Sequence, residues 1–163
     1  MLQLQHIASE GEALNSVRQL FREYVAELNE DLCFQSFEEE LRDPLQKYGP
    51  PKGSLILAYW NAQPVGCIAL TNITKDTDTT HYTCEMKRLY VQPAFRKHHI
   101  GNALVEAILH NAVQLGYRIM KLDTLERLQP AISLYKKYGF TEATAYYQNP
   151  LPGVVYMQKL LSA

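Results

Sequence analysis

The chain of 163 residues has no long hydrophobic run. No apolar stretch approaches the roughly 18–20 residues that a bilayer-crossing helix needs, which argues against a membrane partner. The N-terminal residues 1–5 alternate between apolar and polar. They lack the basic start and apolar core of a signal peptide, so we expect a strand there and a cytoplasmic protein.

Cysteine is scarce, and the few cysteines are not paired in the sequence. Cys33, Cys67 and Cys84 are odd in number, widely spaced and set in apolar surroundings. No C-x-x-C pair indicates a metal or redox site. We therefore expect reduced thiols in the core of a cytosolic protein, and no metal.

The chain also has little net charge, because 16 basic residues face 17 acidic ones and the sum is −1. A dedicated nucleic-acid binder is usually clearly basic, so a nucleic-acid partner is not expected. A hydrophobic content of 47% and a charged content of 20% are typical of a globular protein. With no internal repeat or linker, we expect one domain over residues 1–163.

Hydrophobic patterning predicts alternating helices and strands. The predicted strands are residues 2–7, 54–60, 64–71, 81–91, 118–124, 141–147 and 154–160, and the predicted helices are residues 13–28, 36–43, 101–115 and 130–138. Residues 81–124 then form a parallel βαβ unit. The expected fold class is α/β, a mixed, mostly antiparallel central sheet with a parallel βαβ core, flanked by helices.

Several local features refine this prediction. Two S-x-x-E patterns, Ser9 with Glu12 and Ser36 with Glu39, indicate capping boxes at the first two helices. The run of three acids at residues 38–40 reads as a solvated helix face. Gly66 inside a strand indicates a bulge or a close backbone approach. Strict alternation over residues 81–91 would place Glu85, Leu89 and Val91 on one face.

A basic turn, Arg96-Lys97-His98-His99-Ile100-Gly101, separates the strand at residues 86–91 from the following helix. Backbone N–H groups and the helix dipole converge on an anion at such a turn. The backbone amides of residues 97–102 can cradle a pyrophosphate, and Arg96 and Lys97 can add charge. Adjacent His98 and His99 lack a third ligand, so they do not form a metal site.

From residue 54 to the end, the chain resembles the GNAT superfamily of N-acetyltransferases. The matching segments are "MKRLYVQPAFRKHHIGNALVEAI", "LDT" and "AISLYKKYGF", in the family's order and spacing. The family's phosphate turn reads Q/R-x-x-G-x-G/A. Here Arg96 and Gly101 match the first and last positions, whereas His99 stands at the first glycine. That position can require a positive φ, which His tolerates better than most residues.

The resemblance implies acetyl-CoA as co-substrate and an amine, on a small molecule or a peptide, as acceptor, with direct attack in a ternary complex. It implies acetyl-CoA contacts by Leu89, Tyr90, Val91, Arg96, Lys97, His98, His99, Ile100, Gly101, Asn102 and Ala103. It further implies Glu85 as general base, Tyr135 as the group that protonates the thiolate, and an acceptor pocket bordered by Tyr146, Tyr147 and Tyr156. A homodimer is common in the family.

Plainer explanations remain open at each position. Glu85 can be a solvent-facing or ion-paired carboxylate, with water as the route for the proton. The spacing of Tyr135 also fits a core residue, and the C-terminal tyrosines also fit strand packing. His99, and Leu128 where the family often has Asn, leave open a degenerate acyl-CoA-binding module with little or no turnover. A hydroxyl acceptor is a third possibility.

Overall fold

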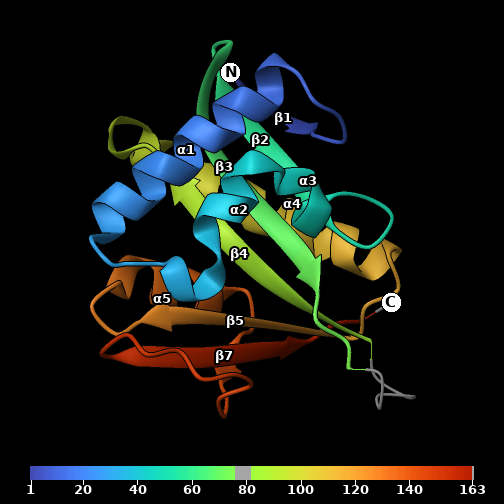
Figure 1. The fold of residues 1–163 in the computed structure, drawn as a ribbon, viewed down its shortest axis with the longest axis vertical. Coiled ribbons are helices and arrows are strands. Elements are labelled where there is room, and N and C mark those ends of the chain that lie inside the picture. The colour runs from blue at the N-terminus through green and yellow to red at the C-terminus, as the bar shows by residue number, and fades with distance from the viewer. Residues whose placement is uncertain (76–81, 163) are drawn as a thin grey trace.

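The computed structural model describes residues 1–75 and 82–162 and has the predicted order of strands and helices, with one further short α-helix at residues 44–48 that the sequence did not predict (Figure 1). The predicted start of one strand at His81 lies outside the described residues. The strands are β1 (Leu2–His6), β2 (Ser54–Trp60), β3 (Gln63–Asn72), β4 (Thr83–Val91), β5 (Ile119–Leu125), β6 (Thr141–Glu142) and β7 (Val154–Leu160). The α-helices are α1 (Glu12–Leu28), α2 (Phe37–Arg42), α3 (Pro44–Tyr48), α4 (Ile100–Gln114) and α5 (Gln129–Lys137), and the 3-10 helices are η1 (Cys33–Gln35) and η2 (Pro93–His98).

The strands form one seven-stranded sheet in the order β1-β2-β3-β4-β5-β7-β6. The β4–β5 pair is parallel and the other neighbouring pairs are antiparallel, which confirms the predicted mixed sheet. The predicted strand at residues 141–147 is wrong beyond Glu142, where β6 ends. The chain leaves the sheet there because Tyr146 and Tyr147 reach across to carboxylates on β4 and β5.

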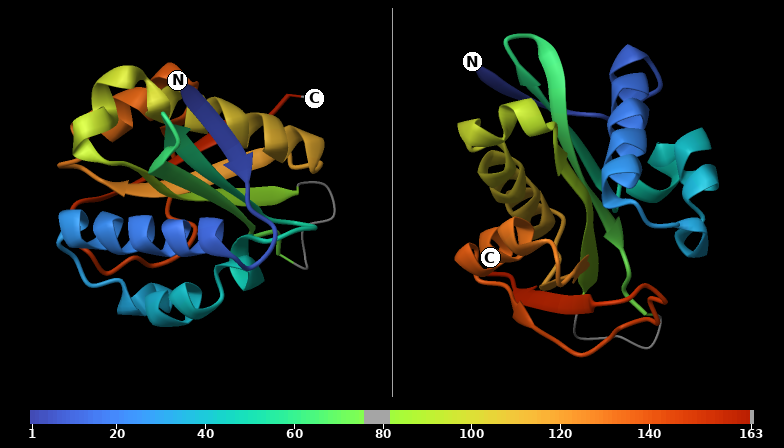
Figure 2. Two further views of the ribbon diagram at one scale, coloured as in Figure 1. Left: turned by 90° about the horizontal axis from the view of Figure 1, so that it is seen from above. Right: turned by 90° about the vertical axis from the view of Figure 1, so that its left-hand side faces the viewer.

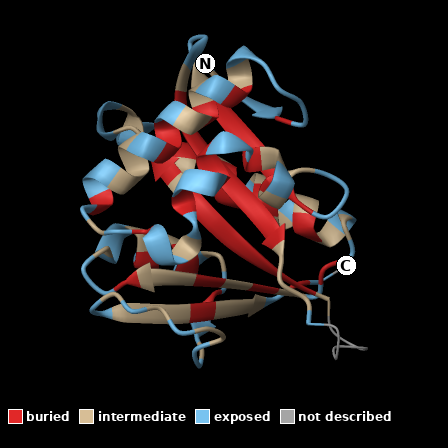
Figure 3. Ribbon diagram, viewed as in Figure 1, coloured by how far each residue is buried: buried red, intermediate tan, exposed pale blue. Residues whose placement is uncertain are grey.

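Helices cover both faces of the sheet (Figure 2). On one face, Leu104 and Ile108 of α4 pack with Ile56 and Ile68 of the sheet. On the other face, α1, α2 and α3 bury a second cluster, which includes Phe21. The central strands between these clusters are almost wholly buried (Figure 3), so the sheet is a rigid frame for any site at its edges.

The two predicted capping boxes are wrong. Helix α1 has Gly11 as its N-cap, two residues beyond Ser9, and no side chain caps it. Ser36 does precede α2, but its backbone is left-handed, with φ 56° and ψ 44°, and it makes no side-chain cap. A capping hydroxyl reaches the first turn from an extended backbone, which Ser36 does not have.

The close approach predicted at Gly66 is confirmed. A β-carbon built there would lie 2.8 Å from the carbonyl oxygen of Tyr90 on β4. The β2–β3 register also shifts between Ala58 and Tyr59, opposite this glycine. Only glycine lets the two backbones come this close, and this draws the end of β4 firmly against β3.

The predicted hairpin between β2 and β3 is confirmed, and both residues of its turn have positive φ, 49° at Asn61 and 69° at Ala62. This turn type favours Asn-Gly, and alanine in the left-handed region is strained. We therefore expect Ala62→Gly to raise the free energy of unfolding by about 0.5–1 kcal/mol in urea denaturation.

The matched control is the same chemical change inside a helix. Ala26 is exposed in α1, and Ala26→Gly should lower the free energy of unfolding by about 1 kcal/mol. Equal losses in both variants would show that Ala62 is not strained.

Candidate functional site

The candidate site lies where β4 and β5 separate. Their parallel pairing is limited to Thr83 with Ile119, Cys84 with Met120, and Glu85 with Lys121. Beyond this point β4 stays paired with β3, β5 stays paired with β7, and the two strands diverge (Figure 1). The backbone edges of β4 and β5 that face each other are therefore not hydrogen-bonded to one another, and a gap opens in the middle of the sheet.

A β-bulge in β4 lies at the mouth of this gap. Cys67 pairs with Tyr90 and Ala69 with Lys87, so Arg88 and Leu89 together oppose a single residue of β3. Arg88 has a left-handed backbone with φ 61°. The bulge reverses the alternation of side chains beyond it.

The bulge corrects one sequence prediction. Val91 belongs with Cys84 and Met86 to the cluster beneath α4, and Leu89 packs against the same cluster, so neither shares the face of Glu85. Tyr90 instead joins the cluster beneath α1. The bulge contains no glycine that would indicate it in the sequence. Strict alternation therefore assigned the side chains at the end of β4 to the wrong faces of the sheet.

The Arg88 side chain forms a buried ion pair. Its Nε lies 2.8 Å from Oε2 of Glu40, and the other carboxylate oxygen, Oε1, accepts a hydrogen bond of 2.8 Å from the Tyr48 hydroxyl. Burial alone would raise the pKa of Glu40, but the charges of Arg88 and then Lys47 outweigh it, and the pKa is lowered. The prediction of a solvated acidic face is therefore wrong for Glu40, although Glu38 and Glu39 are exposed.

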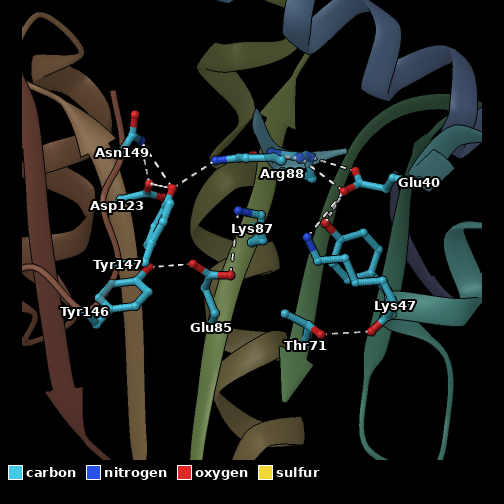
Figure 4. A network of polar contacts seen from close by, with 12 residues as sticks. Glu40, Lys47, Thr71, Glu85, Lys87, Arg88, Asp123, Tyr146, Tyr147 and Asn149 are labelled. Carbon is cyan, nitrogen blue, oxygen red and sulfur yellow. Dashed lines mark hydrogen bonds and ion pairs between the residues drawn. The ribbon is translucent and has the colours of Figure 1, made fainter. Parts of the chain in front are cut away.

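Glu85 and Lys87 project beside this pair (Figure 4). Both are buried, with Lys87 Nζ 3.6 Å from Oε1 of Glu85. Glu85 also accepts a 2.5 Å hydrogen bond from the Tyr146 hydroxyl. Burial lowers the pKa of Lys87, and the charge of Glu85 opposes the shift only in part. Burial, followed by the charge of Glu85, raises the pKa of Tyr146.

A second carboxylate, Asp123 of β5, faces the gap from the other side. It accepts a hydrogen bond from the Tyr147 hydroxyl and one of 2.8 Å from the Asn149 amide. Tyr156 lies behind, where its hydroxyl donates to the Tyr147 carbonyl oxygen and accepts from the Asn149 N–H. Gln35 bridges the two sides, because it donates to the Tyr147 hydroxyl and accepts from Arg88.

Three adjoining hollows follow the gap. The central cavity, of about 80 Å³, is lined by Lys87, Leu89, Asp123, Thr124, Ala131 and Tyr135, among others. The lysine-lined pocket, of about 340 Å³, has Lys47, Glu85, Lys87, Lys121, Tyr146 and Tyr147 in its wall. The α4 groove, of about 520 Å³, has Leu89, Tyr90, Val91, Arg96, His99, Gly101 and Asn102 in its wall. Lys87 lines both the central cavity and the pocket, and Leu89 lines both the central cavity and the groove.

Tyr135 is part of the wall of the central cavity. Its side chain comes from α5, is 8% exposed and packs edge-on against Phe140. Burial raises its pKa well above the ordinary value, so the phenol is a neutral donor at any physiological pH. The residue is both a core tyrosine and part of the cavity wall.

The α4 groove ends at the basic turn. His99 is the N-cap of α4 and has φ 56°, the positive φ that its place in the turn led us to expect. The first ladder bond of the helix runs from the Ala103 N–H to the His99 carbonyl oxygen. The N–H groups of Ile100, Gly101 and Asn102 therefore have no partner within the helix. The Ile100 side chain is fully buried, so only its backbone is available to a ligand.

The basic side chains of the turn differ in their contacts. Arg96 donates a 2.8 Å hydrogen bond to the Val91 carbonyl oxygen and pairs with Glu27 at 2.6 Å. The His98 ring stacks on Trp60 with centroids 4.2 Å apart, away from the groove wall. Lys97 is exposed. Of the predicted cofactor side chains, Lys97, His98, Ile100 and Ala103 are not part of the groove wall.

Within residues 1–75 and 82–162, no cluster of three or more His, Cys, Asp or Glu side chains could hold a metal ion. No helix in the described part of the chain is long and apolar enough to cross a bilayer.

Comparison with known proteins assigns the family. The sequence matches the model of the Acetyltransferase (GNAT) family over residues 14–140. The chain belongs to the GNAT family. An uncharacterized N-acetyltransferase of Schizosaccharomyces pombe is 41% identical over 150 residues, which are 91% of this chain and 89% of the relative. One from Dictyostelium discoideum is 32% identical over 204 residues, 91% of this chain and 94% of the relative. This member of the GNAT family is accordingly an N-acetyltransferase.

Solved structures share the GNAT fold. An acetyltransferase from Streptococcus agalactiae superposes with a TM-score of 0.78 at 22% identity, over 98% of both chains. A GNAT family acetyltransferase from Elizabethkingia anophelis with acetyl-CoA bound gives a TM-score of 0.66 at 19% identity, over 98% of both chains. The predicted fold class is thereby confirmed.

Sequence reasoning missed several residues of the candidate site. Lys87 and Arg88 lie inside the matched segment, yet nothing in their spacing indicated burial. The contribution of Glu40 was hidden among three consecutive acids. Asp123 was not missed, because the sequence places it near the end of a predicted parallel strand, where ligands of α/β sheets bind.

The buried ion pair generates a prediction about stability. Glu40→Gln leaves the Arg88 guanidinium buried without a counter-charge, so we expect the free energy of unfolding to fall by about 3–5 kcal/mol. Chemical denaturation at neutral pH measures the loss. The matched control, Glu39→Gln on the exposed face of α2, should change the free energy by less than about 0.5 kcal/mol.

The same pair fixes the sign of a pH effect. A carboxylate with a lowered folded-state pKa stabilises the fold above its unfolded value, here 4.5, and loses this contribution as the pH falls through the folded-state pKa. The gap between wild type and Glu40→Gln should therefore be full above about pH 5 and shrink below about pH 4. A gap that widens in acid would contradict the assignment.

Proposed function

We propose that the protein transfers an acetyl group from acetyl-CoA to an amine by direct attack in a ternary complex, within one catalytic domain over residues 1–163. One observation carries the proposal: the α4 groove, the central cavity and the lysine-lined pocket adjoin one another across the gap between β4 and β5. Such a passage lets a long cofactor enter from one side of the sheet and an acceptor from the other.

The phosphate end of acetyl-CoA suits the start of α4. The open N–H groups of Ile100, Gly101 and Asn102 and the helix dipole favour a pyrophosphate there. His99 supplies the left-handed turn without a glycine, so the amides stay accessible and the degenerate alternative loses its main support. Arg96, already bonded to Glu27 and the Val91 carbonyl oxygen, adds positive charge at the groove rim.

The thioester end suits the central cavity. The pantetheine arm carries amides, which can pair with the backbone edge at residues 89–91, and the N–H groups beside the bulge can polarise the thioester carbonyl. Tyr135 can protonate the departing thiolate, because its phenol is neutral and faces the same cavity. Leu128 lines this passage where the family often has Asn, which removes one side-chain hydrogen bond to the cofactor.

The acceptor end suits the lysine-lined pocket. Glu85 is the carboxylate in its wall, and it is oriented by the Tyr146 hydroxyl and the Lys87 ammonium. A neutral amine is needed for attack, so Glu85 would accept the proton directly or through a water. Tyr146 and Tyr147 form an aromatic wall that can hold the amine, and Tyr156 supports them from behind.

Acetyl-CoA should raise the melting temperature of the wild-type protein. Gly101→Asp should abolish this shift, because a carboxylate would stand among the amides that receive the pyrophosphate. An acidic residue in the first turn of a helix favours the helix itself, so the apo protein should remain folded. Differential scanning fluorimetry with and without acetyl-CoA measures the effect.

Gly101→Ala is the matched steric control. Its β-carbon would lie 3.4 Å from Cδ2 of Leu134, a flexible side chain, so part of the shift should survive. No shift in the wild type at saturating acetyl-CoA would refute the cofactor assignment.

Two conservative variants test the chemistry. Glu85→Gln should lower turnover about 100-fold at neutral pH, with recovery as the pH approaches the pKa of the acceptor. Tyr135→Phe should lower kcat with little change in acetyl-CoA affinity, because protonation of the thiolate belongs to the transition state. Thiol release across pH and calorimetric binding of acetyl-CoA give both quantities.

Glu39→Gln and Tyr59→Phe are matched controls away from the cavities, and both should keep wild-type rates. Wild-type rates in Glu85→Gln alone would move the proton to a water route. Wild-type rates in both test variants would show that Glu85 is only a structural ion-pair partner and that Tyr135 is only a core residue.

A further inference from the structure

The lysine-lined pocket has a charge pattern that bears on the identity of the acceptor. Its wall includes four lysines, which come from α3, the segment after β3, β4 and β5: Lys47, Lys75, Lys87 and Lys121. Glu85 is the one carboxylate among the described residues that line it. A pocket built only to receive a cationic amine would be expected to carry the opposite balance of charge.

Lys121 contributes a positive charge to the pocket wall. It is half-buried and lies beside Glu85 in the parallel register of β4 and β5. Its ammonium sits 5.5 Å from the centroid of the Tyr146 ring, and no ion pair among the described residues includes it. The aromatic face holds the ammonium in position without neutralising its charge.

Lys47 has a carboxylate nearby but shares it. Its Nζ is 3.6 Å from Oε1 of Glu40, whose other oxygen is 2.8 Å from Arg88. One carboxylate thus faces two cations, and Arg88 holds it more closely. Glu40 therefore balances the charge of Lys47 only in part, so this lysine adds positive charge to the pocket wall formed by α3.

The pocket has a direction. Lys87 and Gln35 line both the pocket and the central cavity, so the reacting amine must point toward them and Glu85. Lys47, on α3, belongs to the pocket wall and is not part of the central cavity, and the same holds for Lys121. Figure 4 shows Lys47 across from Lys87, with Glu85 below. The volume of about 340 Å³ suits a small molecule.

From this arrangement we infer that the acceptor is a small amine that also carries an anionic group, a carboxylate or a phosphate. The anion lies near Lys121 and Lys47, while the amine faces Glu85 at the entrance to the central cavity. This inference rests on the acetyl transfer proposed above. It goes further in naming the class of acceptor and the side chains that select it.

Calorimetry in the presence of CoA tests the inference without requiring turnover. The probes are the twenty L-amino acids, β-alanine and γ-aminobutyrate, each beside its own carboxamide, with phosphoethanolamine beside ethanolamine. The members of a pair share the amine and differ in the anion. For the acids that bind, affinity should exceed that of the carboxamide at least about 10-fold, a difference in the range of one charge-assisted hydrogen bond. The phosphate pair separates the two sources of the anion.

Three variants locate the anion site. Lys121→Gln should weaken the preferred acid about 10-fold and leave its carboxamide unchanged, whereas Lys121→Arg should keep the preference. Lys136→Gln makes the same change of charge on the exposed end of α5 and should have no effect. The melting shift with acetyl-CoA should be the same in all three, because Lys121 lies outside the α4 groove.

Each result can be assigned. Carboxamides that bind as tightly as the acids overturn the inference, as does failure of all the acids and phosphoethanolamine to bind. A loss in Lys121→Gln that falls equally on acid and carboxamide also overturns it. Acids that bind without thiol release from acetyl-CoA would support the anion site and refute the proposed transfer. Equal acetylation of amines with and without an anionic group would support the proposed transfer and refute the anion site.

Discussion

The buried ion pair between Arg88 and Glu40 is the constraint on which the rest of the site depends. Arg88 combines a left-handed backbone with a guanidinium removed from water, and both are unfavourable in isolation. Glu40, Tyr48 and Gln35 offset that cost through hydrogen bonds. The pair fastens α2 to β4 at the bulge. The backbone at residues 89–91 therefore has one fixed orientation toward the gap.

The gap exists because β4 and β5 pair with their outer neighbours over a longer stretch than they pair with each other. β4 is held by β3 as far as Val91, and β5 is held by β7 as far as Leu125, while their mutual pairing stops at Glu85 and Lys121. Each strand keeps one neighbour and loses the other, so the sheet opens without losing its core. Gln35 links Arg88 to Tyr147 across the opening. Gln35 itself lines the central cavity, so this bridge connects two parts of the cavity wall.

How far the sequence predicts this structure depends on whether a feature is local. Strands and helices with strong periodicity, the hairpin turn and the parallel βαβ unit were all predictable. The bulge was not, because it forms at Arg88 without a glycine and is stabilised by residues more than forty positions away. Glu40 looked like Glu38 and Glu39, since a helix of six residues gives too little pattern to identify its buried face. Tyr146 and Tyr147 fitted a strand, yet long-range bonds to Glu85 and Asp123 draw them out of the sheet.

The distinction between local and long-range features also separates the expected cofactor site from the acceptor site. The expected acetyl-CoA contacts come mostly from one continuous stretch, residues 89–103, so the motif that identifies the family also identifies that part of the site. The lysine-lined pocket is assembled from η1, α3, the segment after β3, β4, β5 and the loop after β6, and no short motif spans these segments. Membership of the family therefore says much about the donor and little about the acceptor. The charges that select an acceptor, on Lys47 and Lys121, lie outside the motif and emerge only when the fold brings α3 and β5 into the wall of one pocket.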